Sequence, residues 1–325
     1  MKMLHWVGCA VAGLGIVCAA GCSDGRAGAA PQEQPTIVAT TGMVADVVRA
    51  VAGDRADVQG MMGPGIDPHL YTPTRTDIGK LIAADLIFYN GLLLEGKMTD
   101  SLIRAATSGK PVHAVTEMLD ESRLIEPESF EGLFDPHVWM DPSAWSLAVE
   151  AVRDAMTEFD PAGEDAFARN AEVYLAEVAA LDEYAERVLA SVPESQRVLV
   201  TAHDAFNYFG KRFNFEVVGI QGLSTESEAG VRDIEALVEL LVSREIGAVF
   251  VESTVSDRNI NALIDGAAAR GHTVVIGGSL FSDAMGDPGT YEGTYIGMID
   301  HNVTTIARSL GGEAPPRGMQ GRLAE

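Results

Sequence analysis

The chain has 325 residues, of which 47% are hydrophobic and 22% charged, a composition typical of a globular protein with about two domains. Its 23 Lys and Arg residues are outnumbered by 47 Asp and Glu residues, which gives a formal net charge of −24. An electrostatic field of this sign repels phosphate backbones. The composition therefore argues against a disordered chain and against a nucleic-acid partner.

The first 35 residues predict export. Lys2 precedes an apolar run that ends in Ala19-Ala20-Gly21-Cys22, the pattern of a secretory signal. The ending resembles a bacterial lipobox, in which Cys22 becomes the lipid-bearing first residue. We therefore expect a signal peptide over residues 1–21, a lipidated tether over 22–35, and a membrane-anchored lipoprotein that is periplasmic or on the cell surface.

The number of cysteines limits which disulfides and metal sites the mature chain can form. The three cysteines are Cys9, Cys18 and Cys22, so cleavage before Cys22 leaves a single one. An intramolecular disulfide and a thiolate metal site are both excluded by this count.

Short apolar strands alternate with helices after the tether. We predict strands at residues 36–40, 57–62, 86–89 and 111–115, and helices between them at 42–51, 76–84 and 98–107. This alternation is typical of a mostly parallel sheet with helices on both faces.

The pattern changes at Glu164. Apolar residues recur at steps of three and four from Glu164 to Val192, with charged residues on the other face, which predicts one amphipathic helix of about eight turns. The alternation then resumes, with strands predicted at 197–201, 215–220, 248–251 and 273–276 and a last helix at about 291–310. The expected fold is α/β, with two similar lobes at 36–160 and 194–325 bridged by one long helix at 161–193.

One familiar motif is incomplete. The segment Gly91-Leu-Leu-Leu-Glu-Gly96-Lys97 nearly fits a phosphate-binding loop, but Met98 replaces the hydroxyl residue that would hold Mg²⁺. We do not interpret it as a nucleotide site.

A set of histidines at predicted strand-to-helix junctions is more informative. His69 and His137 each end an Asp-Pro-His tripeptide, where the proline stiffens the turn that presents the ring. His203 follows the predicted strand at 197–201, and Asp283 lies in the loop after the strand at 273–276. Ligands in α/β folds bind at such carboxyl edges of strands, so these four residues can assemble at a cleft between the lobes. A structural role is the alternative for each of them taken singly.

These segments resemble the solute-binding lipoproteins of zinc and manganese ABC transporters, the TroA-like metal-binding family. The resemblance covers the chain from about Thr36 and rests on four motifs in order, which are Gly65-Ile-Asp-Pro-His69, Asp135-Pro-His-Val-Trp139, Thr201-Ala-His-Asp-Ala-Phe-Asn-Tyr-Phe209 and Leu280-Phe-Ser-Asp-Ala-Met-Gly286. It implies that His69, His137, His203 and Asp283 are the metal ligands, one pair from each lobe.

The donor chemistry agrees with that implication. Three neutral imidazoles and one carboxylate suit a borderline divalent ion such as Mn²⁺, Zn²⁺ or Fe²⁺. Asp67, Asp135 and Glu252 are candidates for orienting the ligands, and a capping or solvated role is the alternative for each.

The predicted function is a monomeric receptor, not an enzyme. It would bind one Mn²⁺ or Zn²⁺ per chain and deliver it to a transporter permease driven by a separate ATPase. Two other hypotheses are a zinc-dependent metallohydrolase, which would keep an open metal position for water, and a surface adhesin of the same fold. The resemblance of Ser282-Asp-Ala-Met-Gly286 and Gly293-Thr-Tyr-Ile-Gly297 to manganese-type members favours manganese over zinc.

Overall fold

The first lobe is a four-stranded parallel sheet with helices against it. The computed structural model describes residues 34–127 and 132–324, so Cys22 and the expected signal peptide lie outside it. The strands pair in the order β2-β1-β3-β4. They are β1 (Thr36–Ala39), β2 (Asp57–Gly60), β3 (Leu86–Tyr89) and β4 (Val112–Ala114), and the helices among them are α1 (Gly42–Ala52), α2 (Arg75–Ala83) and α3 (Thr99–Thr107).

The second lobe repeats this plan. Parallel pairs β5-β6 and β7-β8 lie side by side through β5 and β7, so the spatial order matches that of the first lobe. The strands are β5 (Val198–His203), β6 (Glu216–Gln221), β7 (Ala248–Glu252) and β8 (Val275–Leu280), and the helices are α6 (Asn207–Phe213), α7 (Val231–Ser243), α8 (Arg258–Ala269) and α9 (Tyr295–Ser309). The expectation of two similar α/β lobes is confirmed.

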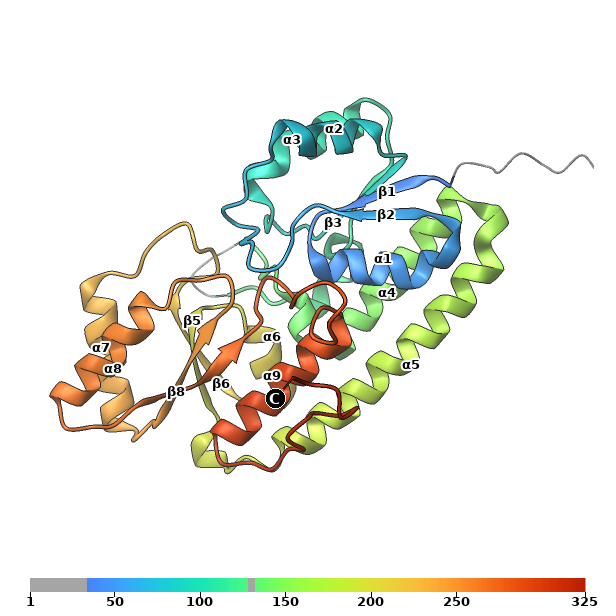
Figure 1. The fold of residues 1–325 in the computed structure, drawn as a ribbon. Helices are drawn as coiled ribbons and strands as arrows, with labels where there is room; N and C mark the ends of the chain where they lie inside the picture. The colour runs from blue at the N-terminus through green and yellow to red at the C-terminus, as the bar shows by residue number, and fades with distance from the viewer. Residues whose placement is uncertain (1–33, 128–131, 325) are drawn as a thin grey trace, which may run out of the picture. The chain divides into compact units, whose positions relative to one another are not determined.

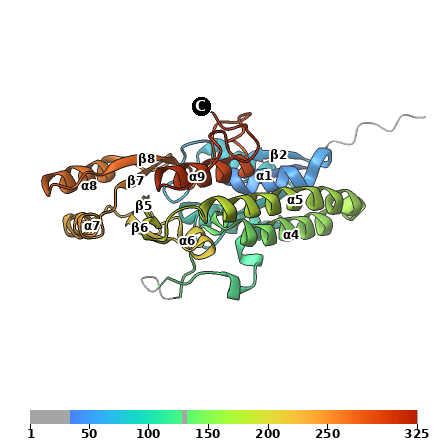
Figure 2. The same cartoon turned by 90° about the horizontal axis from the view of Figure 1, so that it is seen from below.

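A single long helix connects the lobes. Helix α5 (Glu164–Leu189) packs on α1 of the first lobe and on α9 of the second, and Figures 1 and 2 show it running along both. Phe167 and Leu181 are fully buried on this face, which explains the apolar spacing seen in the sequence. None of the helices in the described ranges combines the length and apolar character needed to cross a bilayer.

Helix α4 (Pro142–Phe159) lies beside α5 and was not predicted from the sequence. The sequence does contain signals for the start of a helix here. Asp141 caps the helix by accepting the N–H of Ser143, and Pro142 occupies the first helical position. Apolar residues then recur at helical spacing, including Trp145, Val149 and Val152.

Strand β8 runs further than predicted, to Leu280 instead of Ile276. The glycines at 277 and 278 concealed it, since glycine is disfavoured in strands. A Cβ on Gly278 would overlap the side chain of Thr305 in α9, so glycine here permits close packing of helix on strand. The extension carries the chain to the start of the loop that holds Asp283.

Candidate metal centre

Four residues that are far apart in the sequence meet where the lobes face each other. His69 lies in the turn after β2, and His137 lies just before α4, both in the first lobe. His203 ends β5, and Asp283 follows β8, both in the second lobe. One candidate ligand atom from each lies within 4.8 Å of all the others, and each residue is at most 5% exposed.

The imidazole Nε2 atoms face the carboxylate of Asp283. They lie 3.7 Å from it for His69, 3.4 Å for His137 and 3.3 Å for His203. The Nε2 atoms of His69 and His137 are themselves 3.4 Å apart. This convergence of three rings and a carboxylate from opposite sides is the arrangement needed to surround one small cation.

Three of the atoms facing the centre lack a hydrogen bond to any described residue. They are the Nε2 of His203 and both carboxylate oxygens of Asp283, all of them buried. Buried polar atoms are nearly always satisfied, and an unpaired one costs about 1–3 kcal/mol. A divalent cation bound among them would satisfy these atoms, so the donor set fits a metal.

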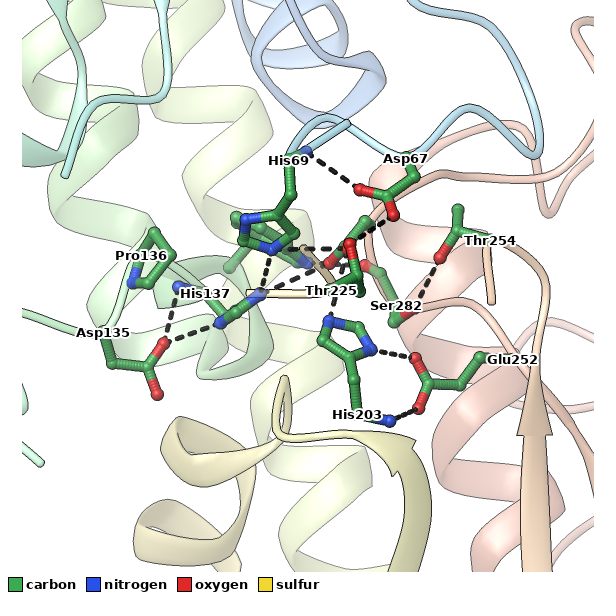
Figure 3. Close-up of polar contacts among 12 residues, drawn as sticks. Asp67, His69, Asp135, Pro136, His137, His203, Thr225, Glu252, Thr254 and Ser282 are labelled. Atoms are coloured by element: carbon green, nitrogen blue, oxygen red, sulfur yellow. Dashed lines mark hydrogen bonds and ion pairs between the residues drawn. The ribbon is translucent and has the colours of Figure 1, made fainter. Parts of the chain in front are cut away.

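Carboxylates behind two of the rings fix their tautomers (Figure 3). The Nδ1 of His137 lies 2.8 Å from Asp135 Oδ1, and the Nδ1 of His203 lies 2.5 Å from Glu252 Oε2. Each acid also accepts the backbone N–H of the same histidine. With Nδ1 protonated and donating, Nε2 keeps its lone pair for a metal, and the ligand becomes more basic.

Asp67 is placed differently from the other two acids. Its Oδ1 accepts the backbone N–H of His69 at 2.8 Å, and its Oδ2 accepts the hydroxyl of Thr225. Among the described residues, no carboxylate is hydrogen-bonded to the Nδ1 of His69. Asp67 therefore orients the turn that carries the ring instead of the ring itself.

The cluster is electrostatically prepared for a cation. Burial opposes the charged form of Asp283, but the three imidazoles, His203 first, hold the pKa of this carboxyl well below its usual range. Burial lowers the pKa of His69 to about 3. Burial also opposes charge on His203, yet Glu252 and Asp283 raise its pKa above the usual value. Asp283 ionised and His69 neutral are the protonation states that divalent metals require, whereas metal binding at His203 must displace a proton that Glu252 and Asp283 favour.

Several contacts hold the ligand segments in place. The indole N–H of Trp139 donates to the carbonyl of Ser282 at 2.9 Å, which ties the His137 segment to the Asp283 loop across the lobes. Asn207 and Tyr208 of α6 donate to the side chain and the carbonyl of Asp135, respectively.

These supporting hydrogen bonds, and the contact of Thr225 with Asp67, were not predicted from the sequence. Trp139, Asn207 and Tyr208 stand inside the motifs that were identified, so their position beside a ligand was a usable signal. Thr225 stands in a loop between β6 and α7 with no motif of its own, and only the tertiary fold brings it to Asp67.

The segment that resembles a phosphate loop has a structural role. The carboxylate of Glu95 is buried and accepts the N–H groups of Asn90 and Gly91 together with the hydroxyl of Thr40. These amide groups are the kind that a phosphate would need, and here an internal carboxylate occupies them.

A cavity of about 440 Å³ borders His69. At 5% exposure, His69 is the most exposed of the four ligand candidates. Residues of both lobes form the rest of the wall, including Leu92, Leu93, Lys97, Leu223 and Glu226.

Comparison with known families agrees with this fold. Residues 37–309 match the family described as zinc-uptake complex component A, periplasmic (ZnuA). The match spans most of the chain, and the protein belongs to this family.

The names of individual relatives refer to different metals. The chain is 46% identical to the manganese-binding lipoprotein MntA of Bacillus subtilis, over 89% of this chain and 94% of that one. It is also 46% identical to the zinc-binding protein TroA of Treponema pallidum, over 88% and 92% of the two chains. The solved structure of that TroA superposes with a TM-score of 0.83 at 45% identity, covering 85% of this chain and 99% of the other. The Fe(III)-bound YtgA of Chlamydia trachomatis superposes with a TM-score of 0.75 at 29% identity, over 86% and 99%.

Proposed function

We propose that this protein is an extracytoplasmic solute-binding protein that captures one divalent transition metal ion, manganese or zinc, and delivers it to the permease of an ABC transporter. A separate ATPase would drive the transport. The observation that carries the proposal is the buried cluster of His69, His137, His203 and Asp283, in which the inward-facing atoms of His203 and Asp283 have no hydrogen bond to any described residue. We assign these four residues as the metal ligands.

The comparisons support a transport role. Relatives of nearly the same length are named as binders of manganese or zinc, and the matched family is that of a zinc-uptake component. Three imidazoles and one carboxylate accept either ion, and zinc has the higher intrinsic affinity at most nitrogen and oxygen sites. We favour manganese as the transported ion, from the sequence around Asp283 and the similarity to MntA.

The metallohydrolase hypothesis is disfavoured by the neighbourhood of the cluster. Four protein ligands close a tetrahedral site, whereas a catalytic zinc keeps a position for water. The nearby acids Asp67, Asp135 and Glu252 all accept N–H groups of the histidines, so they are poorly placed to activate water. No feature specific to an adhesin supports that alternative.

We also propose the remaining organisation from the sequence. A signal peptide would occupy 1–21 and a tether lipidated at Cys22 would occupy 22–35, with lobes at 36–160 and 194–325 and a connector at 161–193. The chain would act as a monomer anchored by its lipid.

Titration of the metal-free mature protein tests the function. We expect one Zn²⁺ or Mn²⁺ per chain by calorimetry, and no turnover of ester or phosphate substrates. His137→Ala should weaken binding by more than about 100-fold, since even the loss of an outer partner of a ligand typically costs 10–100-fold. Unchanged affinity in this variant would remove His137 from the ligand set, and catalytic turnover would reinstate the hydrolase.

A further inference from the structure

The three histidines are not held alike. The ring of His137 is held at Nδ1 by the carboxylate of Asp135, and the ring of His203 is held at Nδ1 by that of Glu252. Each carboxylate belongs to the same lobe as its histidine. The corresponding acid for His69 is Asp67, which accepts the backbone N–H of His69 and, among the described residues, makes no hydrogen bond to its ring. His69 is also the ligand candidate that lines the cavity between the lobes. Its position therefore depends on the turn that carries it more than on a bond to the ring.

That turn is bonded to the opposite lobe. The hydroxyl of Thr225, in the loop between β6 and α7, donates to Asp67 Oδ2 at 2.5 Å. Figure 3 shows Asp67 between the backbone of His69 and this threonine. One carboxylate thus accepts from the first lobe through one oxygen and from the second lobe through the other.

The same loop makes a second contact across the cavity. Glu226 lies 3.7 Å from Lys97 of the first lobe, and both side chains are well exposed. A surface ion pair of this kind contributes little. The Thr225 bond is the stronger of the two connections, because it is partly buried and its atoms are 2.5 Å apart, whereas the exposed ion pair spans 3.7 Å.

We propose that Thr225 is a positioning residue for metal binding, which holds His69 toward the other ligands through Asp67 and so slows release of the ion. The proposal rests on the assignment of His69 as a ligand. Without the hydroxyl, Asp67 loses its bond to the second lobe, and the turn at 67–69 gains freedom to move His69 away from the centre.

Two substitutions at this position separate the bond from the bulk of the side chain. Thr225→Val keeps the shape and removes the hydroxyl, whereas Thr225→Ser keeps a hydroxyl that can still donate. Thr157→Val is the matched control, since Thr157 is also part-buried but donates to Arg153 within its own helix. The three variants and the wild type would be loaded with Co²⁺, whose absorption bands report coordination geometry, and with Zn²⁺ for kinetics.

We expect chelator-induced Zn²⁺ release from Thr225→Val to be about 10-fold faster, the lower end of the effect that losing a direct partner of a ligand has on affinity, because Thr225 acts on His69 through Asp67. Its Co²⁺ spectrum should change, while Thr225→Ser and Thr157→Val should match the wild type in both measurements. Melting of the metal-free forms identifies a structural effect. A lower melting temperature in Thr225→Val with unchanged release and spectrum would overturn the proposal. Failure of the wild type to bind one Co²⁺ would instead contradict the proposed function.

Discussion

At the scale of single residues, the candidate metal centre combines one anionic side chain with three imidazoles. The three imidazoles differ in the hydrogen bonds that hold them in place. Within residues 34–127 and 132–324, Asp283 is the only carboxylate of the cluster, and neither of its oxygens has a hydrogen bond there. Its charge offsets part of the charge of a divalent ion in a buried setting, where electrostatic interactions are strong. Removing this group should therefore affect metal binding more than any change nearby in the same loop.

Asp283→Ala should abolish most of the stabilisation that metal gives. An ion that binds only the folded state adds about 2.7 kcal/mol to the free energy of unfolding when its free concentration is 100 times the dissociation constant. Asp287→Ala should retain the gain, because Asp287 is exposed and lies four residues away. Thermal melting with and without Zn²⁺ checks both variants. Equal metal-induced shifts in the wild type and in Asp283→Ala would contradict the ligand assignment.

At the scale of elements, one partly buried acid joins three helices. Asp46 of α1 accepts the hydroxyl of Tyr174 in α5 at 2.8 Å and the backbone N–H of Tyr295 at the start of α9 at 3.1 Å. It therefore connects the first lobe, the long helix and the second lobe. Burial raises the pKa of Asp46, although the two hydrogen bonds and Arg49 offset part of the rise.

The raised pKa predicts a pH dependence of stability. The folded protein holds the Asp46 proton to higher pH than the unfolded chain, whose Asp pKa is about 3.9. The folded state then binds more protons within this window, so stability falls as pH rises from the unfolded pKa to the folded pKa. Asp46→Asn keeps a neutral acceptor for Tyr174 and Tyr295 and should remove this dependence. Denaturant unfolding of both proteins as a function of pH measures the difference, which should move steadily in favour of Asp46→Asn as pH rises and then become constant. A difference that does not change with pH would show that Asp46 does not titrate in this range.

At the scale of the whole molecule, the connection between the lobes is stiff. The long helix α5 packs on both lobes, and α4 lies along it. Trp139 adds a bond from the first lobe to the Asp283 loop. These contacts favour modest local adjustment of the ligand segments over wide hinge closure when metal binds.

Anchoring is a separate property of the whole molecule. Cys22→Ser should prevent lipidation and release the protein from membranes, because no other cysteine remains after the expected cleavage. Fractionation of cells, with mass analysis of the mature N-terminus, checks this outcome. Membrane association that survives in the variant, together with an unacylated wild type, would contradict the lipobox interpretation.

The fold class and the candidate ligands could be predicted from the amino-acid sequence alone. Strand and helix periodicities depend on the local spacing of apolar residues. Each Asp-Pro-His turn can be recognised from three consecutive residues. The four ligand candidates could be named because each stands at a strand end or a stiff turn, positions that α/β folds bring to one edge. Helix α4 was within reach of the same reasoning, since the Asp141-Pro142 cap and the apolar spacing are local signals.

The groups that hold the candidate ligands could not be predicted from the sequence, because their contacts form only in the folded protein. Asp67, Asp135 and Glu252 looked equivalent in the sequence, yet two of them bond to imidazole rings and Asp67 bonds to a backbone N–H and to Thr225. These pairings join residues up to 158 positions apart, and they depend on how loops of two lobes approach each other. Such approach is set by the packing of α5 on α1 and α9, which local periodicity does not encode.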